Sequence, residues 1–278
     1  MERVGEHPVP AGPLAVRWHS YELDAARAGT PATARLRLEN AGSAPWRSRG
    51  RDGVHLSYHW LDPLGNPIVW DGARASFPRA VLPGEEIELE TSVLAPRPPG
   101  DYRLAFDLVE EHRFWFQELG STPLDIAVHV SPRIDERRLR VDVRGGQHPD
   151  TEAALSLQEE PLVSGDAEAV AYLVAGAVPA PDWSRLLLDA HAEGWAAVGG
   201  AVSVEGGLTA RAERRRLAAW APGSGRNPRL GRPLLFPSLL DGLEPGEHEG
   251  LPAFEGADAL FEGRAVVRLR PRSGRPSG

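Results

Sequence analysis

Cysteine and lysine are both absent from the 278 residues of this chain. Without cysteine it can form no disulfide, no thiol nucleophile and no cysteine-ligated zinc site, although the compartment is left open. All positive charge comes from arginine, and 31 basic residues stand against 39 acidic ones, for a formal net charge of -8. A chain with that charge has no field that gathers nucleic acid or anionic membranes, so we expect no nucleic-acid partner.

Long apolar runs are also missing. No stretch is long and apolar enough to span a bilayer. Residues 1–16 place acidic residues and prolines where a secretion signal needs a basic start and an apolar run. We therefore expect a cytoplasmic protein with no membrane span.

The first half contains a regular two-residue alternation of apolar and polar side chains, which is the period of strands with one buried face. Pro83-Gly84 and Pro98-Pro99-Gly100 separate such runs and favour turns. About seven strands fit, the number that an immunoglobulin-like sandwich needs. We predict an N-terminal all-β Ig-like sandwich over residues 14–131, after a flexible segment 1–13. The expected strands cover residues 14–18, 33–39, 54–60, 68–70, 87–93, 102–108 and 124–130.

The alternation stops at Ser131-Pro132-Arg133, so we place a linker at residues 132–138. Beyond it, apolar runs of strand length alternate with helical patterns, for example at residues 182–193 and 208–220. This order predicts a two-domain protein whose second part is a small α/β domain with a mainly parallel sheet, over residues 139–270. Residues 271–278 read as a disordered tail.

Several spaced motifs give the first half a resemblance to a known family. They are Asn40, Gly42, Pro45 and Trp46, then Pro83-Gly84-Glu85, Ala95-Pro96 and Pro99-Gly100-Asp101-Tyr102. The pattern resembles the tryptophan-rich Ig-like domains found in autophagy cargo receptors and, in bacteria, beside enzymes of surface-polysaccharide synthesis. The segment LSYHWLDPLGNPIVWDGAR is especially similar to the bacterial, glycan-associated branch. The resemblance implies a binding or spacing module without chemistry of its own.

The second half resembles the middle of family-2 glycosyltransferases of the GT-A fold. The matching residues are Pro179, Pro181, Asp182, Trp183, Gly199 and Gly200. The two acidic positions of that pattern, which imply a divalent cation held against a sugar nucleotide, are occupied by Val174 and Gly176. This leaves two alternatives: a remnant that no longer catalyses, or an enzyme with displaced ligands.

Five residues of the first half are candidates for ligand binding. Trp46, Trp70 and Trp115 lie at expected strand ends or turns, where an exposed indole can stack on a sugar ring or anchor a protein. Asp71 and Arg74 follow Trp70 closely and would add an acceptor and a bidentate donor. The alternative is that these tryptophans cap the sandwich core and that Arg74 pairs with Asp71.

In the second half, Arg226 and Asn227 lie in a Gly- and Arg-rich loop and could clamp a phosphate or a carboxylate. A plain solvated loop is the alternative. His55 and His59 share one strand face but lie about 13 Å apart by the strand rise, too far for one metal ion. We therefore expect no metal site, no catalytic residues and no cofactor.

Together these features suggest a non-catalytic accessory or binding protein that acts in surface-glycan synthesis. Its expected partner is a glycan or a protein of glycan synthesis, such as a glycosyltransferase. The alternative is an active sugar-nucleotide-dependent glycosyltransferase of the GT-A type. The two hypotheses differ in whether the second half binds a metal and a nucleotide.

Overall fold

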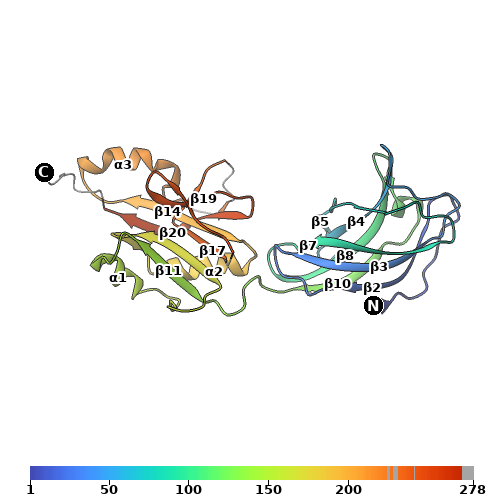
Figure 1. Ribbon diagram of the computed structural model, residues 1–278, viewed down its shortest axis with the longest axis horizontal. Coiled ribbons are helices and arrows are strands. Elements are labelled where there is room, and N and C mark those ends of the chain that lie inside the picture. The colour runs from blue at the N-terminus through green and yellow to red at the C-terminus, as the bar shows by residue number, and fades with distance from the viewer. Residues whose placement is uncertain (224–225, 228–230, 241, 271–278) are drawn as a thin grey trace. The chain divides into compact units, whose positions relative to one another are not determined.

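The computed structural model describes residues 1–223, 226–227, 231–240 and 242–270 (Figure 1). The chain divides into two compact units, Met1–Pro132 and Arg133–Gly278, here called unit 1 and unit 2. The predicted tail at residues 271–278 lies outside the described residues. No helix among the described residues is long and apolar enough to cross a membrane.

Unit 1 consists of two antiparallel sheets with a shared core, a β-sandwich, and each of the seven strands expected from the sequence is present. The first sheet has the order β1 (Glu2–Arg3), β2 (Val16–Leu23), β3 (Pro31–Asn40) and β7 (Glu86–Leu94). The second has the order β10 (Leu124–Val130), β8 (Gly100–Glu110), β4 (Val54–Leu61) and β5 (Pro67–Val69). Two short strands extend it: β6 (Ala75–Ser76) pairs with β4, and β9 (Phe114–Trp115) pairs with β8.

The core of unit 1 follows from the alternation. Leu36 and Leu38 of β3, in the first sheet, are completely buried. Leu56 of β4 and Phe106 of β8, in the second sheet, are also completely buried and belong to the same core. Strand residues two apart point to the same face, so each run delivers its apolar set inward. Figure 1 shows β2, β3 and β7 as neighbouring strands of the first sheet.

The two ends of unit 1 differ from the expected boundaries. The segment expected to be flexible contains β1, whose Glu2 and Arg3 pair with Tyr21 and Ser20 of β2. At the other end, the expected linker, residues 132–138, includes Arg133, whose guanidinium bonds the Gly194 carbonyl at 2.7 Å within unit 2.

Unit 2 is built on a seven-stranded sheet with helices. Its order is β11 (Leu139–Arg144), β12 (Ala169–Val174), β17 (Pro237–Leu240), β14 (Ala197–Val204), β20 (Ala259–Leu269) and β13 (Ala177–Pro179), and β15 (Arg226–Asn227) pairs with β20. A small sheet has the order β16 (Leu234–Leu235), β19 (Leu251–Phe254) and β18 (Gly246–His248).

The sheet is mixed, and the prediction of a mainly parallel sheet holds only for its two longest ladders. Only β11 with β12 and β14 with β20 are parallel, whereas the pairs that involve β17, β13 and β15 are antiparallel. The cause is β17, which runs back between β12 and β14. A continuous apolar run indicates burial on both faces but does not indicate strand direction.

The helices of unit 2 are α1 (Pro149–Leu155), α2 (Trp183–Ala192) and α3 (Arg211–Arg216). The helix expected over residues 208–220 is broken: a 3₁₀ turn, Leu208–Ala210, precedes α3, and another, Ala218–Trp220, follows it. None of the α3 residues is buried, whereas Leu217 and Trp220 beyond its end are. Without an apolar stripe of its own, α3 has no packing to extend it.

Candidate ligand-binding site

The outer face of the second sheet in unit 1 is covered, although such a face is commonly solvated in a sandwich. Ser57 and His59 of β4 and Asp107 of β8 point away from the core, and each is at most 1% exposed. Ser57 lies directly opposite Asp107 in the ladder. Segments 70–77 and 111–119 supply the covering contacts, so three polar side chains are buried beneath two loops.

Two tryptophans form the cover above His59. The Trp70 ring stacks on the imidazole at 4.1 Å between centroids, and Trp115 meets it edge-on at 4.3 Å. The rings of Trp70 and Trp115 are themselves 6.2 Å apart in an edge-to-face arrangement. Trp70 remains 46% exposed. One face of its indole is therefore backed by His59, while nearly half of the side chain faces solvent.

His59 is held in one orientation by hydrogen bonds at both ring nitrogens. Its Nδ1 bonds the Trp70 carbonyl oxygen, and its Nε2 lies 3.4 Å from the Gln117 amide nitrogen. Burial lowers the pKa of His59. The ring is therefore neutral at neutral pH, with Nδ1–H donating to the carbonyl and Nε2 accepting from the amide.

Arg74 ties the cover to the sheet. Its guanidinium donates to Ser57 Oγ at 2.9 Å, to the Gly72 carbonyl at 2.8 Å and to Glu111 at 2.5 Å. It also pairs with Asp71 at 2.6 Å, and it lies 5.0 Å from the Trp115 ring centroid. Nε and Nη1 are thus engaged within the protein. Arg74 acts as an internal clamp that holds Trp115, and not as the free bidentate donor that the sequence suggested.

Gly72 explains how the chain after Trp70 can lie against β4. Its N–H donates to the Tyr58 carbonyl at 3.0 Å. A Cβ atom at this position would lie 2.6 Å from that same carbonyl oxygen, so only glycine permits the approach. The close contact fixes the backbone between the exposed residues Trp70 and Asp71 and the buried clamp of Arg74.

Asp107 anchors the second covering loop. Its carboxylate accepts hydrogen bonds from the Leu108 N–H at 2.8 Å and from the Gln117 N–H at 3.1 Å. Burial raises the pKa of Asp107 to about 7. The Gln117 bond fastens the 3₁₀ turn Phe116–Leu119, and this positions Trp115 immediately before it.

Four of the candidates from unit 1 come together in this site, namely Trp70, Asp71, Arg74 and Trp115. Trp46 does not join them, and its expected role as an exposed ligand-binding residue is wrong. It is completely buried, with its ring 5.5 Å from Phe77 and 6.0 Å from Phe116. The aromatic that closes the polar turn thus belongs to the sandwich core, where it packs against other aromatic rings.

Sequence reasoning missed the buried half of the site. Ser57, His59 and Asp107 are polar residues on strands whose other face is apolar, and alternation alone assigns them to solvent. One signal was available: Asp107 interrupts the run from Leu104 to Val109, whose remaining five residues are all apolar. An acidic residue within such a run suggests a covered outer face.

Of the two candidates in unit 2, Arg226 is paired within the protein. Arg226 pairs with Glu193 at 2.5 Å and with Glu262 at 2.6 Å, and Glu262 is completely buried. This guanidinium is therefore engaged in ion pairs within unit 2, and Arg264 also pairs with Glu262, at 2.7 Å. The backbone of Asn227 pairs with Phe261, and its side chain lies outside the described residues.

A cavity of about 880 Å³ lies at the ends of β11 and β12 in unit 2. It is lined by Val174 and Gly176, the two positions where the glycosyltransferase pattern has acids. Three carboxylates do line the cavity, but from other positions, those of Asp150, Glu213 and Glu249. The lining also includes Arg144, Arg216 and Arg270.

The paired glycines of unit 2 have a packing role. A Cβ atom on Gly199 would lie 2.5 Å from the Leu234 side chain, and one on Gly200 would lie 2.0 Å from the Ala265 carbonyl oxygen. Both residues are in β14, where the ladder with β20 shifts register. Close approach of neighbouring strands therefore accounts for both glycines.

One pair in unit 2 has the geometry of a nucleophile and a base. His191 Nε2 lies 2.8 Å from Ser238 Oγ, and His191 Nδ1 lies 2.8 Å from the Trp195 carbonyl oxygen. Both side chains are completely buried, and burial lowers the pKa of His191 to about 4. A substrate has no access to the pair, so its role is to join α2 to β17.

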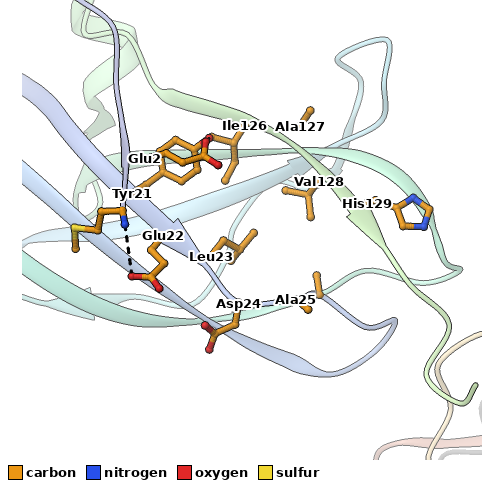
Figure 2. Close-up of a pocket in the computed structure, with 12 residues that line it drawn as sticks. Glu2, Tyr21, Glu22, Leu23, Asp24, Ala25, Ile126, Ala127, Val128 and His129 are labelled. Carbon is orange, nitrogen blue, oxygen red and sulfur yellow. Dashed lines mark hydrogen bonds and ion pairs between the residues drawn. The ribbon is translucent and has the colours of Figure 1, made fainter.

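A pocket of about 430 Å³ lies in unit 1 between β2 and β10 (Figure 2). Leu23, Ile126 and Val128 are among the residues that line it. Its polar groups pair with one another: the Met1 amine lies 4.0 Å from Glu22, and the Tyr21 hydroxyl donates to Glu2 at 2.5 Å. This is an open edge of the sandwich, without the stacked rings of the Trp70 site.

No protein-family model matches the chain, and no curated protein matches it either. Similar solved structures include the C-terminal domain of wzt, with a TM-score of 0.32 and 14% identity over 45% of this chain and 77% of that one. A β-glucuronidase of glycoside hydrolase family 2 has a TM-score of 0.27 and 11% identity, over 40% of this chain and 11% of its own. A cycloisomaltooligosaccharide glucanotransferase from Paenibacillus sp. has a TM-score of 0.26 and 19% identity, over 53% and 18%. The last two are named as carbohydrate-active enzymes, but such scores decide neither fold nor function.

Proposed function

We propose that this chain is a non-catalytic binding protein of surface-glycan synthesis, and that unit 1 is an Ig-like module that captures a glycan on the exposed face of Trp70. The observation that carries the proposal is the half-exposed indole backed by a buried histidine. A sugar ring presents an apolar face that stacks on such a plane, and its hydroxyls need a few fixed polar partners.

Preorganisation supports this assignment. The Trp70 ring is fixed by stacking on His59, and the following backbone is fixed by the contact of Gly72 with Tyr58. A site that is rigid before binding loses little conformational entropy when it binds. Asp71 supplies an acceptor beside the ring, because its side chain is 68% exposed although it pairs with Arg74.

Glycan capture is tested with Trp70→Ala on a printed array of bacterial surface polysaccharides. We expect the wild-type chain to bind a subset of the array and Trp70→Ala to lose that binding, with the melting temperature changed by only a few degrees. Leu82→Ala is the matched control, because Leu82 is another exposed apolar side chain of unit 1, 55% exposed, outside the site. Retention of binding by Trp70→Ala, or an equal loss in Leu82→Ala, would contradict the assignment.

A second candidate function, a glycosyltransferase with displaced ligands, is favoured by one observation. The cavity lined by Val174 and Gly176 is also lined by Asp150, Glu213 and Glu249. Carboxylates in that position could hold a divalent cation against a diphosphate. However, Glu213 and Glu249 both pair with Arg216, and Asp150 pairs with Arg270 at 2.9 Å, so all three carboxylates are engaged in ion pairs within the chain.

The two functions are separated by calorimetric titration with UDP- and GDP-sugars in the presence of Mn²⁺ or Mg²⁺. We expect no heat of binding. Metal-dependent binding in the micromolar range, abolished by Glu213→Gln, would favour the transferase over the accessory protein. The same experiment on Glu205→Gln controls for a general loss of acidic charge, because Glu205 pairs with Arg268 and is not among the residues that line the cavity.

A further inference from the structure

The outer face of the first sheet in unit 1 gathers three metal-ligating side chains from three neighbouring strands. His19 lies on β2, Glu39 on β3 and Glu86 on β7. Glu39 and Glu86 are directly opposite each other in the ladder. Two like charges in that position destabilise a sheet unless a cation lies between or beside them.

A β-bulge turns His19 toward this pair. The register between β2 and β3 shifts between Trp18 and Ser20, so His19 is left without a partner residue in the ladder. Trp18 stays in the core at 2% exposed, while the His19 ring turns to the outer face. Bulges re-aim side chains in this way at the expense of ladder pairing. Here the unpaired residue of the bulge brings its imidazole within 3.7 Å of both carboxylates.

The distances suit a tetrahedral metal ion. His19 Nε2 lies 3.2 Å from Glu39 Oε2 and 3.7 Å from Glu86 Oε1, and the three ligand atoms all lie within 4.8 Å of one another. Zinc bonds of 2.0–2.1 Å to nitrogen and oxygen place tetrahedral ligand atoms about 3.3 Å apart. Small side-chain shifts would therefore complete the coordination.

Each of the two carboxylates also accepts hydrogen bonds from an arginine. Arg17 Nη1 donates to Glu39 Oε1 at 3.1 Å and to Oε2 at 2.9 Å. Arg37 Nε donates to Glu86 Oε2 at 2.8 Å, which leaves Oε1 turned toward His19. Hydrogen-bonded outer partners of this kind orient the carboxylate ligands of metal sites. The competing explanation is a surface ion-pair network in which the arginines alone balance the two acids.

We propose that His19, Glu39 and Glu86 form a zinc-binding site, with a fourth position open to water. The imidazole nitrogen selects a transition metal over Ca²⁺ or Mg²⁺, which prefer oxygen ligands throughout. Because the ligands come from β2, β3 and β7, a bound ion would join three of the four strands of the first sheet.

The test uses the full chain and Zn²⁺ itself, added from a chelator buffer and followed by calorimetry. Co²⁺ serves as a second probe, because tetrahedral coordination by nitrogen and oxygen gives an intense visible absorption. We expect one saturable site, a Co²⁺ spectrum of tetrahedral type, and a melting temperature that rises with Zn²⁺ concentration. The variants His19→Ala and Glu86→Gln should each weaken Zn²⁺ affinity by about 100-fold.

The matched control is His129→Ala. His129 also pairs with a carboxylate, that of Asp101 at 2.8 Å, but on the other sheet and outside the group of three. It should leave Zn²⁺ binding unchanged. Circular dichroism of each variant shows whether it is folded, and because Glu86 is 42% exposed, Glu86→Gln tests the ligand with little risk to folding. No saturable Zn²⁺ binding, equal losses in His129→Ala, or equal affinity for Ca²⁺ would each overturn the proposal.

Discussion

Each unit buries titratable side chains, and the two differ in what covers them. In unit 1, His59 and Asp107 lie under an aromatic cover, and one of the covering rings, Trp70, is 46% exposed. In unit 2, the His191 and Ser238 side chains are completely buried, and the imidazole bonds the Ser238 hydroxyl and the Trp195 carbonyl. A buried polar group that packs against an exposed aromatic ring can influence a ligand, because it orients the ring that the ligand contacts. A fully enclosed pair can affect only stability.

The largest expected effect comes from breaking the enclosed pair. His191→Ala removes a fully buried ring and leaves Ser238 Oγ and the Trp195 carbonyl without that partner, so we expect a loss of about 3–5 kcal/mol from the unfolding free energy of unit 2. Trp70→Ala should cost unit 1 only about 1 kcal/mol, because the side chain is half exposed and loses mainly its ring stacking. Scanning calorimetry of the full chain measures both.

Trp46→Ala is the control for that comparison. Trp46 is completely buried in unit 1, so its removal should cost about 3–5 kcal/mol. If Trp70→Ala lowers the unfolding free energy as much as Trp46→Ala does, then Trp70 is a core residue and does not offer an exposed ring to a ligand.

A smaller difference should appear in the pH dependence of the two units. Burial raises the pKa of Asp107 from 3.8 to about 7. The folded state therefore holds a proton that the unfolded state has released, and the unfolding free energy of unit 1 falls as pH rises through this range. Burial lowers the pKa of His191 from 6.5 to about 4, so unit 2 loses stability as pH falls from 6.5 to 4. Each unit of pKa difference corresponds to about 1.4 kcal/mol.

Urea denaturation between pH 4 and pH 8 checks these opposite slopes. Asp107→Asn should reduce the decrease in the unfolding free energy of unit 1 with rising pH. Asp125→Asn is the control, on the exposed face of β10, and should leave that decrease unchanged. Glu118 lies near Asp107 and raises the pKa further, whereas the lowered pKa of His59 acts in the other direction on unit 1. Parallel slopes in the two units, or an unchanged slope in Asp107→Asn, would show that Asp107 is ionised in the folded state.

The smallest effect is expected from removing unit 2 altogether. The hydrophobic clusters of the two units share no residue, so residues 1–132 should unfold cooperatively with a melting temperature within a few degrees of unit 1 in the full chain. The fragment ends before Arg133, whose side chain bonds Asp258 at 2.6 Å inside unit 2. Tryptophan fluorescence during heating measures the melting temperature of the fragment. An unfolded fragment would mean that the folding of unit 1 depends on unit 2.

The sequence by itself determined the strands of unit 1. Alternation with a period of two identifies the buried face of each strand, and the prolines and glycines between the runs mark the turns. The same reasoning selected Trp46, Trp70 and Trp115 because each lies at an expected strand end or turn, and Asp71 and Arg74 because they follow Trp70 closely. That Trp115 contacts the Trp70 ring was not predicted and follows from the pairing of β8 with β4. In unit 2, apolar runs located some of the strands, but the mainly parallel sheet predicted from them is a mixed sheet in the structure.

Only the tertiary structure decided which tryptophans are exposed and which polar residues are covered. Trp46 and Trp70 both lie at polar turns in the sequence, yet one fills the core and the other faces solvent, because exposure depends on what packs from elsewhere in the chain. His59, Ser57 and Asp107 meet the covering loops through such long-range contacts, and His19, Glu39 and Glu86 meet through a bulge and two ladders. The local sequence pattern indicates which side chains share a face of a strand. Pairing between segments that are distant in the sequence determines which other residues that face contacts.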